Sequence, residues 1–98
     1  MVKARECFQS AIKASPQNAQ AYNNLGALCQ QLGEFKDAED NYKQAIAIQQ
    51  DYAEVHYNLG TLYFRMKKYD LSLREANLAD RLGCNVIPLK MALNKATK

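Results

Sequence analysis

Two asparagines that stand 34 residues apart, Asn24 and Asn58, combine a useful chemistry with a regular spacing. A carboxamide donates and accepts hydrogen bonds at the same time, so it can pair with an extended peptide backbone of any sequence. Each of the two asparagines is followed directly by Leu-Gly. The pair therefore predicts two equivalent contacts to a bound peptide, and two solvated surface amides are the alternative.

Aromatic and basic side chains lie close to the second asparagine in the sequence. Tyr57 and Phe64 offer large contact areas of the kind that anchor a partner, although packing against a neighbouring helix would use the same rings. Arg65 and Lys68 carry donors that suit an acidic side chain or a terminal carboxylate, or else they form a solvated face. The sequence leaves both pairs of interpretations open.

Residue types that carry catalysis or metal binding form no recognisable pattern in this chain. His56 is the single histidine and has no second histidine or cysteine pair near it, so we expect it to pack rather than to bind zinc. Cys7, Cys29 and Cys84 are odd in number, which favours reduced thiols. No serine stands in a nucleophile motif and no glycine-rich phosphate loop is present. We therefore predict no enzymatic activity, no cofactor and no metal.

Charge and hydropathy narrow the partner class and the location. The net charge is +3 with a pI of about 8.8, and the basic residues are interspersed with acids, so no nucleic-acid partner is expected. The acids Asp37, Glu39 and Asp40 cluster near a predicted helix start, where they complement the helix dipole. No apolar run is long enough for a membrane span, and residues 1–6 lack the apolar stretch of a signal peptide. We expect a cytoplasmic protein without membrane contact.

An internal repeat of 34 residues assigns these side chains to elements. A shift by 34 places Ala19 on Ala53 and Leu28 on Leu62. The same shift superposes Phe35 on Tyr69, Ala45 on Ala79, Ala4 on Ala38, Phe8 on Tyr42 and Ile12 on Ile46. We therefore predict one domain made of a partial repeat over residues 1–16, full repeats over 19–52 and 53–86, and a capping helix over 87–98.

Apolar residues recur every three or four positions in each half of a repeat, which predicts amphipathic helices in pairs. Gly33 permits a tight reversal between the two helices of the first full repeat. Lys67 takes that place in the second repeat and predicts a looser or costlier turn. Asn18 and Asp51 are candidate caps of the first helices, and Pro88 suits the first turn of the capping helix.

Small residues recur at positions where paired helices should approach closely. A larger side chain at such a position would overpack the contact and cost about 1–3 kcal/mol. These positions are Gly26, Gly60, Ala38, Ser72, Ala45 and Ala79.

The pattern resembles the tetratricopeptide repeat, a family of 34-residue helix–turn–helix units. In that family a large residue, Leu-Gly and a second large residue mark the first helix, and a small residue, an aromatic residue and an alanine mark the second. The first full repeat matches at Tyr22, Leu25, Gly26, Cys29, Gly33, Phe35, Ala38, Tyr42 and Ala45. The second repeat departs at Lys67, which replaces the turn glycine, and at Ala76, which replaces the aromatic residue. The resemblance implies an all-α fold, an α-solenoid of antiparallel helix pairs.

The resemblance also implies that the first helices line a concave groove that binds a protein or peptide. The residues expected to face this groove are those left over once the apolar face is assigned to packing. In the first full repeat they are Gln20, Asn23, Asn24, Ala27, Gln30 and Gln31. In the second they are Glu54, Tyr57, Asn58, Thr61, Phe64 and Arg65.

One family mode of binding is disfavoured by the residues present. In the members that bind chaperone C-termini, lysine, arginine and asparagine side chains on three successive first helices form a clamp that holds two carboxylates of the ligand. The positions that match the clamp here are Asn23, Ala27, Asn58, Pro88 and Ala92, of which only Asn58 fits.

We therefore predict a non-catalytic scaffold that binds a protein segment in its groove. One alternative is a self-associating structural module. The first predicted helix has no preceding partner, which would leave Cys7, Phe8 and Ile12 available for a homodimer or array. Another alternative is the targeting arm of a larger enzyme.

Overall fold

The computed structural model describes residues 2–15 and 17–97, with the side chains of residues 2–5 and 8 outside the description. Most of the described residues are helical and none of them forms a strand, so the predicted all-α fold is confirmed. The helices are α1 (Val2–Ala14), α2 (Ala19–Gln31), α3 (Phe35–Ile48), α4 (Ala53–Arg65), α5 (Tyr69–Arg81) and α6 (Ile87–Ala96).

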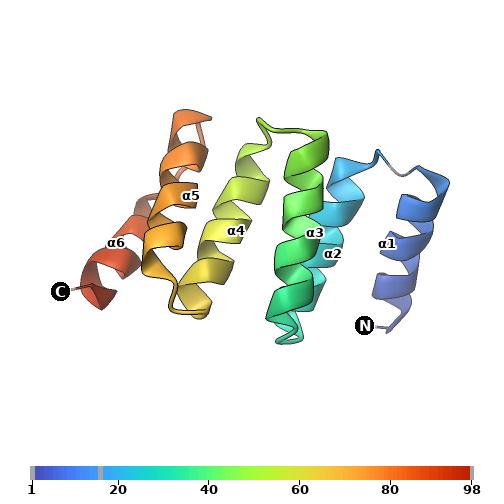
Figure 1. The fold of residues 1–98 in the computed structure, drawn as a ribbon, viewed down its shortest axis with the longest axis horizontal. Helices are drawn as coiled ribbons and strands as arrows, with labels where there is room; N and C mark the ends of the chain where they lie inside the picture. Colours follow the sequence, from blue (N-terminus) through green and yellow to red (C-terminus); the bar gives the residue numbers. More distant parts are fainter. Residues whose placement is uncertain (1, 16, 98) are drawn as a thin grey trace. The chain divides into compact units, whose positions relative to one another are not determined.

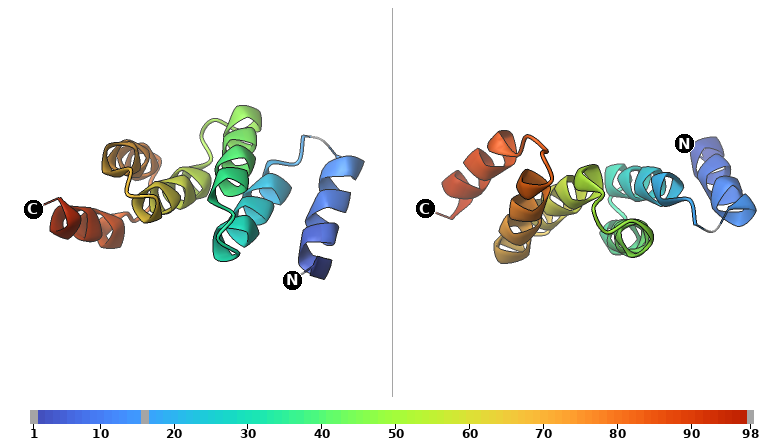
Figure 2. Two further views of the ribbon diagram at one scale, coloured as in Figure 1. Left: turned by 60° about the horizontal axis from the view of Figure 1, so that its bottom comes forward. Right: turned by 90° about the horizontal axis from the view of Figure 1, so that it is seen from above.

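The chain folds into two compact units, residues 1–50 and residues 51–98. In the first unit α2 and α3 lie side by side in opposite directions, and α1 contacts α2 (Figure 1). In the second unit α4 and α5 form the corresponding antiparallel pair, and α6 contacts both of them (Figure 2). Each unit therefore contains one helix pair and one additional helix.

A glycine allows the helices of the first unit to approach each other. A Cβ atom built on Gly26 would lie 2.7 Å from Cδ1 and Cε1 of Tyr42, so the ring occupies the space that a side chain would need. Tyr42 is 1% exposed, and its hydroxyl donates a hydrogen bond of 2.8 Å to Oε1 of Gln30. Ala38 and Ala45 on the same helix are fully buried. The predicted role of small residues in this contact is confirmed.

The second unit brings its helices together with different atoms. The hydroxyl of Ser72 donates a hydrogen bond of 2.7 Å to the backbone carbonyl of Gly60, and both residues are buried. A Cβ atom on Gly60 would meet Cδ2 of Leu89 at 3.1 Å, so α6 supplies part of the cover that the tyrosine provides in the first unit. The buried core that α5 and α6 share consists of Ala76, Ala79, Val86, Leu89 and Leu93.

Three helices end in the same hydrogen-bonded turn. The residues at its left-handed position are Gly33 with φ +78°, Lys67 with φ +62° and Gly83 with φ +92°. In each turn the amide that follows this residue returns to a carbonyl five residues earlier, as in a Schellman motif. The closing bonds join Glu34 N to Cys29 O (2.9 Å), Lys68 N to Tyr63 O (2.8 Å) and Cys84 N to Ala79 O (2.9 Å). The turn at Lys67 is therefore as tight as the glycine turns, and the expectation of a looser reversal was wrong.

The predicted helix starts agree with the structure at two positions of three. Asn18 caps α2, since its Oδ1 accepts a hydrogen bond of 3.0 Å from the amide of Ala21. Pro88 lies in the first turn of α6. The prediction for Asp51 was wrong, because Tyr52 is the N-cap of α4 and no side chain caps this end.

The left-handed conformation of Lys67 predicts that Lys67→Gly stabilises the protein. A non-glycine residue in this conformation costs about 1–2 kcal/mol, and the greater freedom of glycine in the unfolded chain offsets part of the gain. We expect the free energy of unfolding to rise by about 0.5–1 kcal/mol in urea titrations followed by circular dichroism. Gly33→Lys is the reciprocal control and should lower it. A lower stability of Lys67→Gly would contradict this account.

The two helical glycines should respond differently to alanine. Gly26→Ala forces a methyl group into the buried ring of Tyr42. We expect this substitution to lower the free energy of unfolding by about 1–2 kcal/mol. Gly60→Ala meets the flexible end of Leu89 and gains about 1 kcal/mol of helix propensity, so it should stay within about 0.5 kcal/mol of the parent. Thermal unfolding measures the stability of both variants. Equal losses of stability would show that the space between Gly26 and Tyr42 does not require a glycine.

Candidate functional site

The two asparagines of the repeat occupy equivalent positions on first helices, Asn24 on α2 and Asn58 on α4. Both residues are half-buried, between the buried face of their helix and its exposed face. The backbone carbonyl of Asn58 accepts a hydrogen bond of 2.7 Å from the hydroxyl of Thr61. Each unit therefore presents one such amide at the edge of an exposed helix face, and ligand contact by the two side chains stays a prediction.

Most of the other residues expected on the first-helix faces remain accessible. Ala27 and Thr61 are half-buried. The exposed members of the set are Gln20, Gln31, Glu54 and Arg65. Asn23 differs from the expectation, because it is only 3% exposed and has polar contacts within the protein. Gln30 also belongs to the fold, since it accepts the hydrogen bond from the hydroxyl of Tyr42.

The aromatic candidates on α4 contribute to the core of their unit. Tyr57 and Phe64 are half-buried and pack against the cluster of buried residues that α5 and α6 share. The ring of Phe64 lies 5.6 Å from the ring of Tyr69, measured between centroids, at a tilted angle of 58°. Packing therefore uses part of each ring, and only the remaining surface is available to a partner.

His56 is held inside the second unit by an acid that the sequence analysis did not single out. Its Nδ1 lies 3.0 Å from Oε2 of Glu75 on α5, and the histidine is 6% exposed. The histidine therefore packs within its own repeat, against the second helix of that repeat. Buried polar side chains are normally hydrogen-bonded, so the expected burial of His56 implied a polar partner on a neighbouring helix. Glu75, 19 positions later on the paired helix, is that partner.

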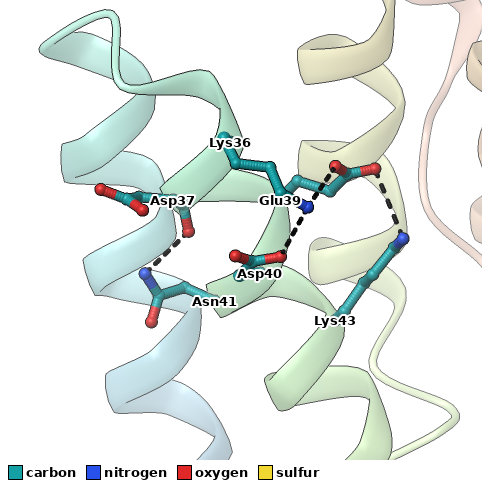
Figure 3. Close-up of polar contacts among 6 residues, drawn as sticks. All are labelled: Lys36, Asp37, Glu39, Asp40, Asn41 and Lys43. Carbon is teal, nitrogen blue, oxygen red and sulfur yellow. Dashed lines mark hydrogen bonds and ion pairs between the residues drawn. The ribbon is translucent and has the colours of Figure 1, made fainter.

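Two of the three acids in the cluster on α3 pair with lysines of the same helix (Figure 3). Nζ of Lys36 lies 3.3 Å from Asp40 and 3.9 Å from Glu39, and Nζ of Lys43 lies 3.4 Å from Glu39. Asp37 stands in the first turn, as its predicted role in the helix dipole requires. The ion pairs and the position in the first turn explain why acids occur here, and no bound ligand is needed for that explanation.

The N-terminal residues considered for self-association fall on α1. Cys7 is exposed and Ile12 is half-buried, and the side chain of Phe8 lies outside the described residues. All three cysteines are free thiols, with Cys29 buried and Cys84 half-buried. Self-association through this helix stays a prediction.

No set of three or more potential metal ligands comes together among the side chains that the structure describes. None of the described helices has the length and apolar character needed to cross a bilayer.

Comparison with known sequences decides the family. The family model described as TPR repeat matches residues 3–33 and 28–67, and the one described as tetratricopeptide repeat matches residues 53–82. The chain belongs to the tetratricopeptide repeat family. Together these matches cover both helix pairs of the structure.

The curated relatives of this tetratricopeptide repeat protein are much longer chains. The protein O-mannosyl-transferase Tmtc3 of Drosophila melanogaster is 34% identical over 62 residues, which are 63% of this chain and 7% of that protein. SPINDLY of Hordeum vulgare, a probable UDP-N-acetylglucosamine–peptide N-acetylglucosaminyltransferase, is 39% identical in an alignment 80 residues long, and the match covers 74% of this chain and 8% of that protein. The chain thus spans less than a tenth of the length of either relative.

Solved structures of other tetratricopeptide repeat proteins are similar. YrrB, a TPR protein with an unusual peptide-binding site, matches with a TM-score of 0.80 and 25% identity over 83% of this chain and 42% of its own. MamA matches with a TM-score of 0.76 and 25% identity over 81% of this chain and 46% of its own. The first TPR of Spaghetti (RPAP3), bound to an HSP90 peptide, matches with a TM-score of 0.86 over 95% and 74%, and its identity of 20% shows the fold alone.

Two ion pairs of the second unit, one buried and one exposed, each use an acid of α5 and should differ in their contribution to the free energy of unfolding. Glu75→Ala removes the carboxylate beside the buried His56, and we expect a loss of about 1–3 kcal/mol. Asp80→Ala breaks the exposed pair with Lys90, which lies at 3.3 Å, and should change stability by no more than about 0.5 kcal/mol. Urea titrations of both variants measure this difference. A loss for Glu75→Ala as small as that for Asp80→Ala would contradict a structural role of the buried pair.

Proposed function

We propose that this chain is a non-catalytic interaction module that binds a segment of a partner protein through the first-helix faces of its repeats. The observation that carries the proposal is the division of α2 and α4 into two faces. The buried face of these helices carries Leu25, Leu28, Leu59 and Leu62. Polar residues on the opposite face, at positions between the leucines, stay accessible. A helix that has already buried its apolar stripe leaves its other face free for recognition.

The chemistry of the accessible faces suits a peptide backbone better than a single charged group. Asn24 and Gln20 on α2 carry amides, and on α4 Asn58 carries another beside the hydroxyl of Thr61. Such groups donate and accept, so they can satisfy an extended chain without demanding a particular sequence. The similarity to YrrB, which has a peptide-binding site, supports this class of ligand. We expect an affinity on the order of micromolar for a short peptide.

Chaperone C-termini are not the proposed ligand. Although the RPAP3 domain is bound to an HSP90 peptide, its similarity to this chain concerns the fold alone. At the positions that match the carboxylate clamp, Ala27 and Ala92 carry no polar side chain and Asn23 is buried. The proposal therefore favours ligands that are recognised through backbone and amide contacts. A cytoplasmic location stays part of this proposal.

A second candidate function follows from the names of the curated relatives. Both are described as transferases, and in each the matching stretch is a small fraction of the protein. The same helix faces would then act as the targeting arm of a larger enzyme and would bring its substrate proteins close. The chemical step would belong to other parts of such an enzyme.

Substitution of the repeated asparagines should weaken peptide binding without loss of fold. Peptides selected from a phage-displayed random library on the parent protein serve as the probe, and fluorescence anisotropy measures their affinity. Asn24→Ala combined with Asn58→Ala should weaken binding at least about tenfold, because two amide contacts are removed. For peptides that carry an acidic residue, adding Arg65→Glu should weaken binding further, because it places a negative charge where Arg65 was.

The matched control is Gln9→Ala combined with Gln44→Ala, which removes two exposed amides from α1 and α3. This control should bind like the parent, and circular dichroism should show that all variants are folded. Equal binding by the asparagine variant would overturn the proposal. Sedimentation of Phe8→Asp separates the self-association alternative, since loss of an oligomer with intact peptide binding would assign assembly to α1 and binding elsewhere.

A further inference from the structure

The second helices of the two full repeats carry different chemistry at equivalent positions. A shift by 34 places Glu39 on Leu73 and Asp40 on Arg74. On α3 the two acids pair with lysines of the same helix (Figure 3). On α5 the leucine that replaces Glu39 is 46% exposed. The surface of α5 has thus exchanged a self-neutralised charge cluster for an exposed apolar side chain beside a cation.

Two arginines provide the positive charge of this surface. Arg74 and Arg81 are exposed, and neither forms an ion pair with an acid in the part of the chain that the structure describes. Two of the three acids of α5 are engaged elsewhere, Glu75 with His56 and Asp80 with Lys90, and the third, Asp70, stands in the first turn of the helix. The two arginines are seven residues apart, which is two helical turns or about 10.5 Å along the axis.

The charge of the whole chain is concentrated in the same unit. Residues 51–98 contain eight lysines and arginines and five acids, whereas residues 1–50 contain five of each. The net charge of +3 therefore belongs entirely to the second unit. Such an asymmetry steers an acidic partner toward this unit at moderate ionic strength.

The surface is also hollowed. A shallow depression of about 480 Å³ lies along α5 and is lined by Asp70, Leu73, Arg74, Asn77, Leu78 and Arg81. A second depression of about 340 Å³ lies between α5 and α6, shares Asp70, Leu73 and Asn77 with the first, and includes the buried Leu93 in its lining. Leu73 therefore stands between two depressions, where apolar side chains of a partner can pack on both sides of it.

We propose that this surface, here named the α5 face and defined by Leu73, Arg74, Asn77, Leu78 and Arg81, docks an acidic amphipathic helix of a partner protein. The acids of that helix pair with the two arginines, and its apolar residues cover the leucines. Asp70 stands at the N-terminal end of the same depression and requires a neutral or basic residue of the partner there. The site lies on a second helix and is separate from the first-helix faces proposed above to bind peptides.

The observations favour a protein helix over a nucleic acid. A phosphate backbone gains nothing from the exposed Leu73 and is repelled by Asp70. A second copy of α1 is also a poor occupant, because the residues of α1 include three cations and one acid and would meet a surface of like charge.

Charge reversal on the α5 face tests the proposal. The probe is an end-capped helical peptide of about 18 residues, with two glutamates seven positions apart and leucines on the same face. We expect it to bind the parent protein in fluorescence anisotropy and to bind Arg74→Glu combined with Arg81→Glu at least about tenfold more weakly. A second peptide with lysines in place of the glutamates should prefer the reversed variant over the parent. Leu73→Ser should weaken the first peptide several-fold, and added salt should weaken both charge-dependent complexes.

The matched control is Lys13→Glu combined with Lys95→Glu, which changes the net charge equally at exposed sites outside the α5 face. It should bind the acidic peptide within about twofold of the parent. Asn24→Ala combined with Asn58→Ala should also bind normally, which separates this site from the proposed peptide-binding faces. Absence of binding to the parent, equal loss in both charge variants, or binding of a single-stranded oligonucleotide with the same dependence on Arg74 and Arg81 would each overturn the proposal.

Discussion

The pairing of α2 with α3 depends on the absence of one methyl group. The backbone at Gly26 offers a flat surface, and the ring of Tyr42 lies on it at a distance that no Cβ atom would allow. The hydroxyl at the far end of this ring is satisfied by Gln30, so the tyrosine is buried without loss of its hydrogen bond. In the second unit Ser72 binds the backbone of Gly60 directly, and Leu89 covers the glycine. Two different sets of atoms thus solve the same problem, which is to bury the apolar stripes of two thin helices against each other.

Much of the fold follows from the 34-residue period, because its apolar and small positions depend only on the spacing of residues along a helix. The helix pairs, the glycine contacts and the cap at Asn18 all belong to this class of local or periodic features. Hydrogen bonds between helices do not, since they depend on the rotation of each helix and on side-chain rotamers. The partner of His56 was missed for this reason, and Asn23 was placed on an exposed face although the helix turns it inward. Asp51 has the right residue type for a cap, but the helix begins after Tyr52.

The repeats share a backbone and differ in what they display. Both repeats of this chain keep small and apolar residues where their paired helices touch, while their outward positions differ. The contrast between α3 and α5 illustrates this difference, as α3 pairs Glu39 and Asp40 with its own lysines and α5 leaves cations beside an exposed leucine. A comparison of equivalent positions within one chain therefore reveals surface chemistry that neither repeat reveals alone.

The contact between the ring of Tyr42 and the backbone of Gly26 also fixes the position of α3 along α2. If α3 slid along α2 by one helical turn, the ring would meet a side chain three or four residues from Gly26, such as that of Tyr22 or Cys29, in place of open backbone. The length of the connection through Gly33 is consequently fixed at both ends, by the closing bond from Glu34 to Cys29 and by the ring two turns further on. Insertions or deletions in this short connection cannot be absorbed by slippage, so length variation between related chains is expected to accumulate outside the helix pairs.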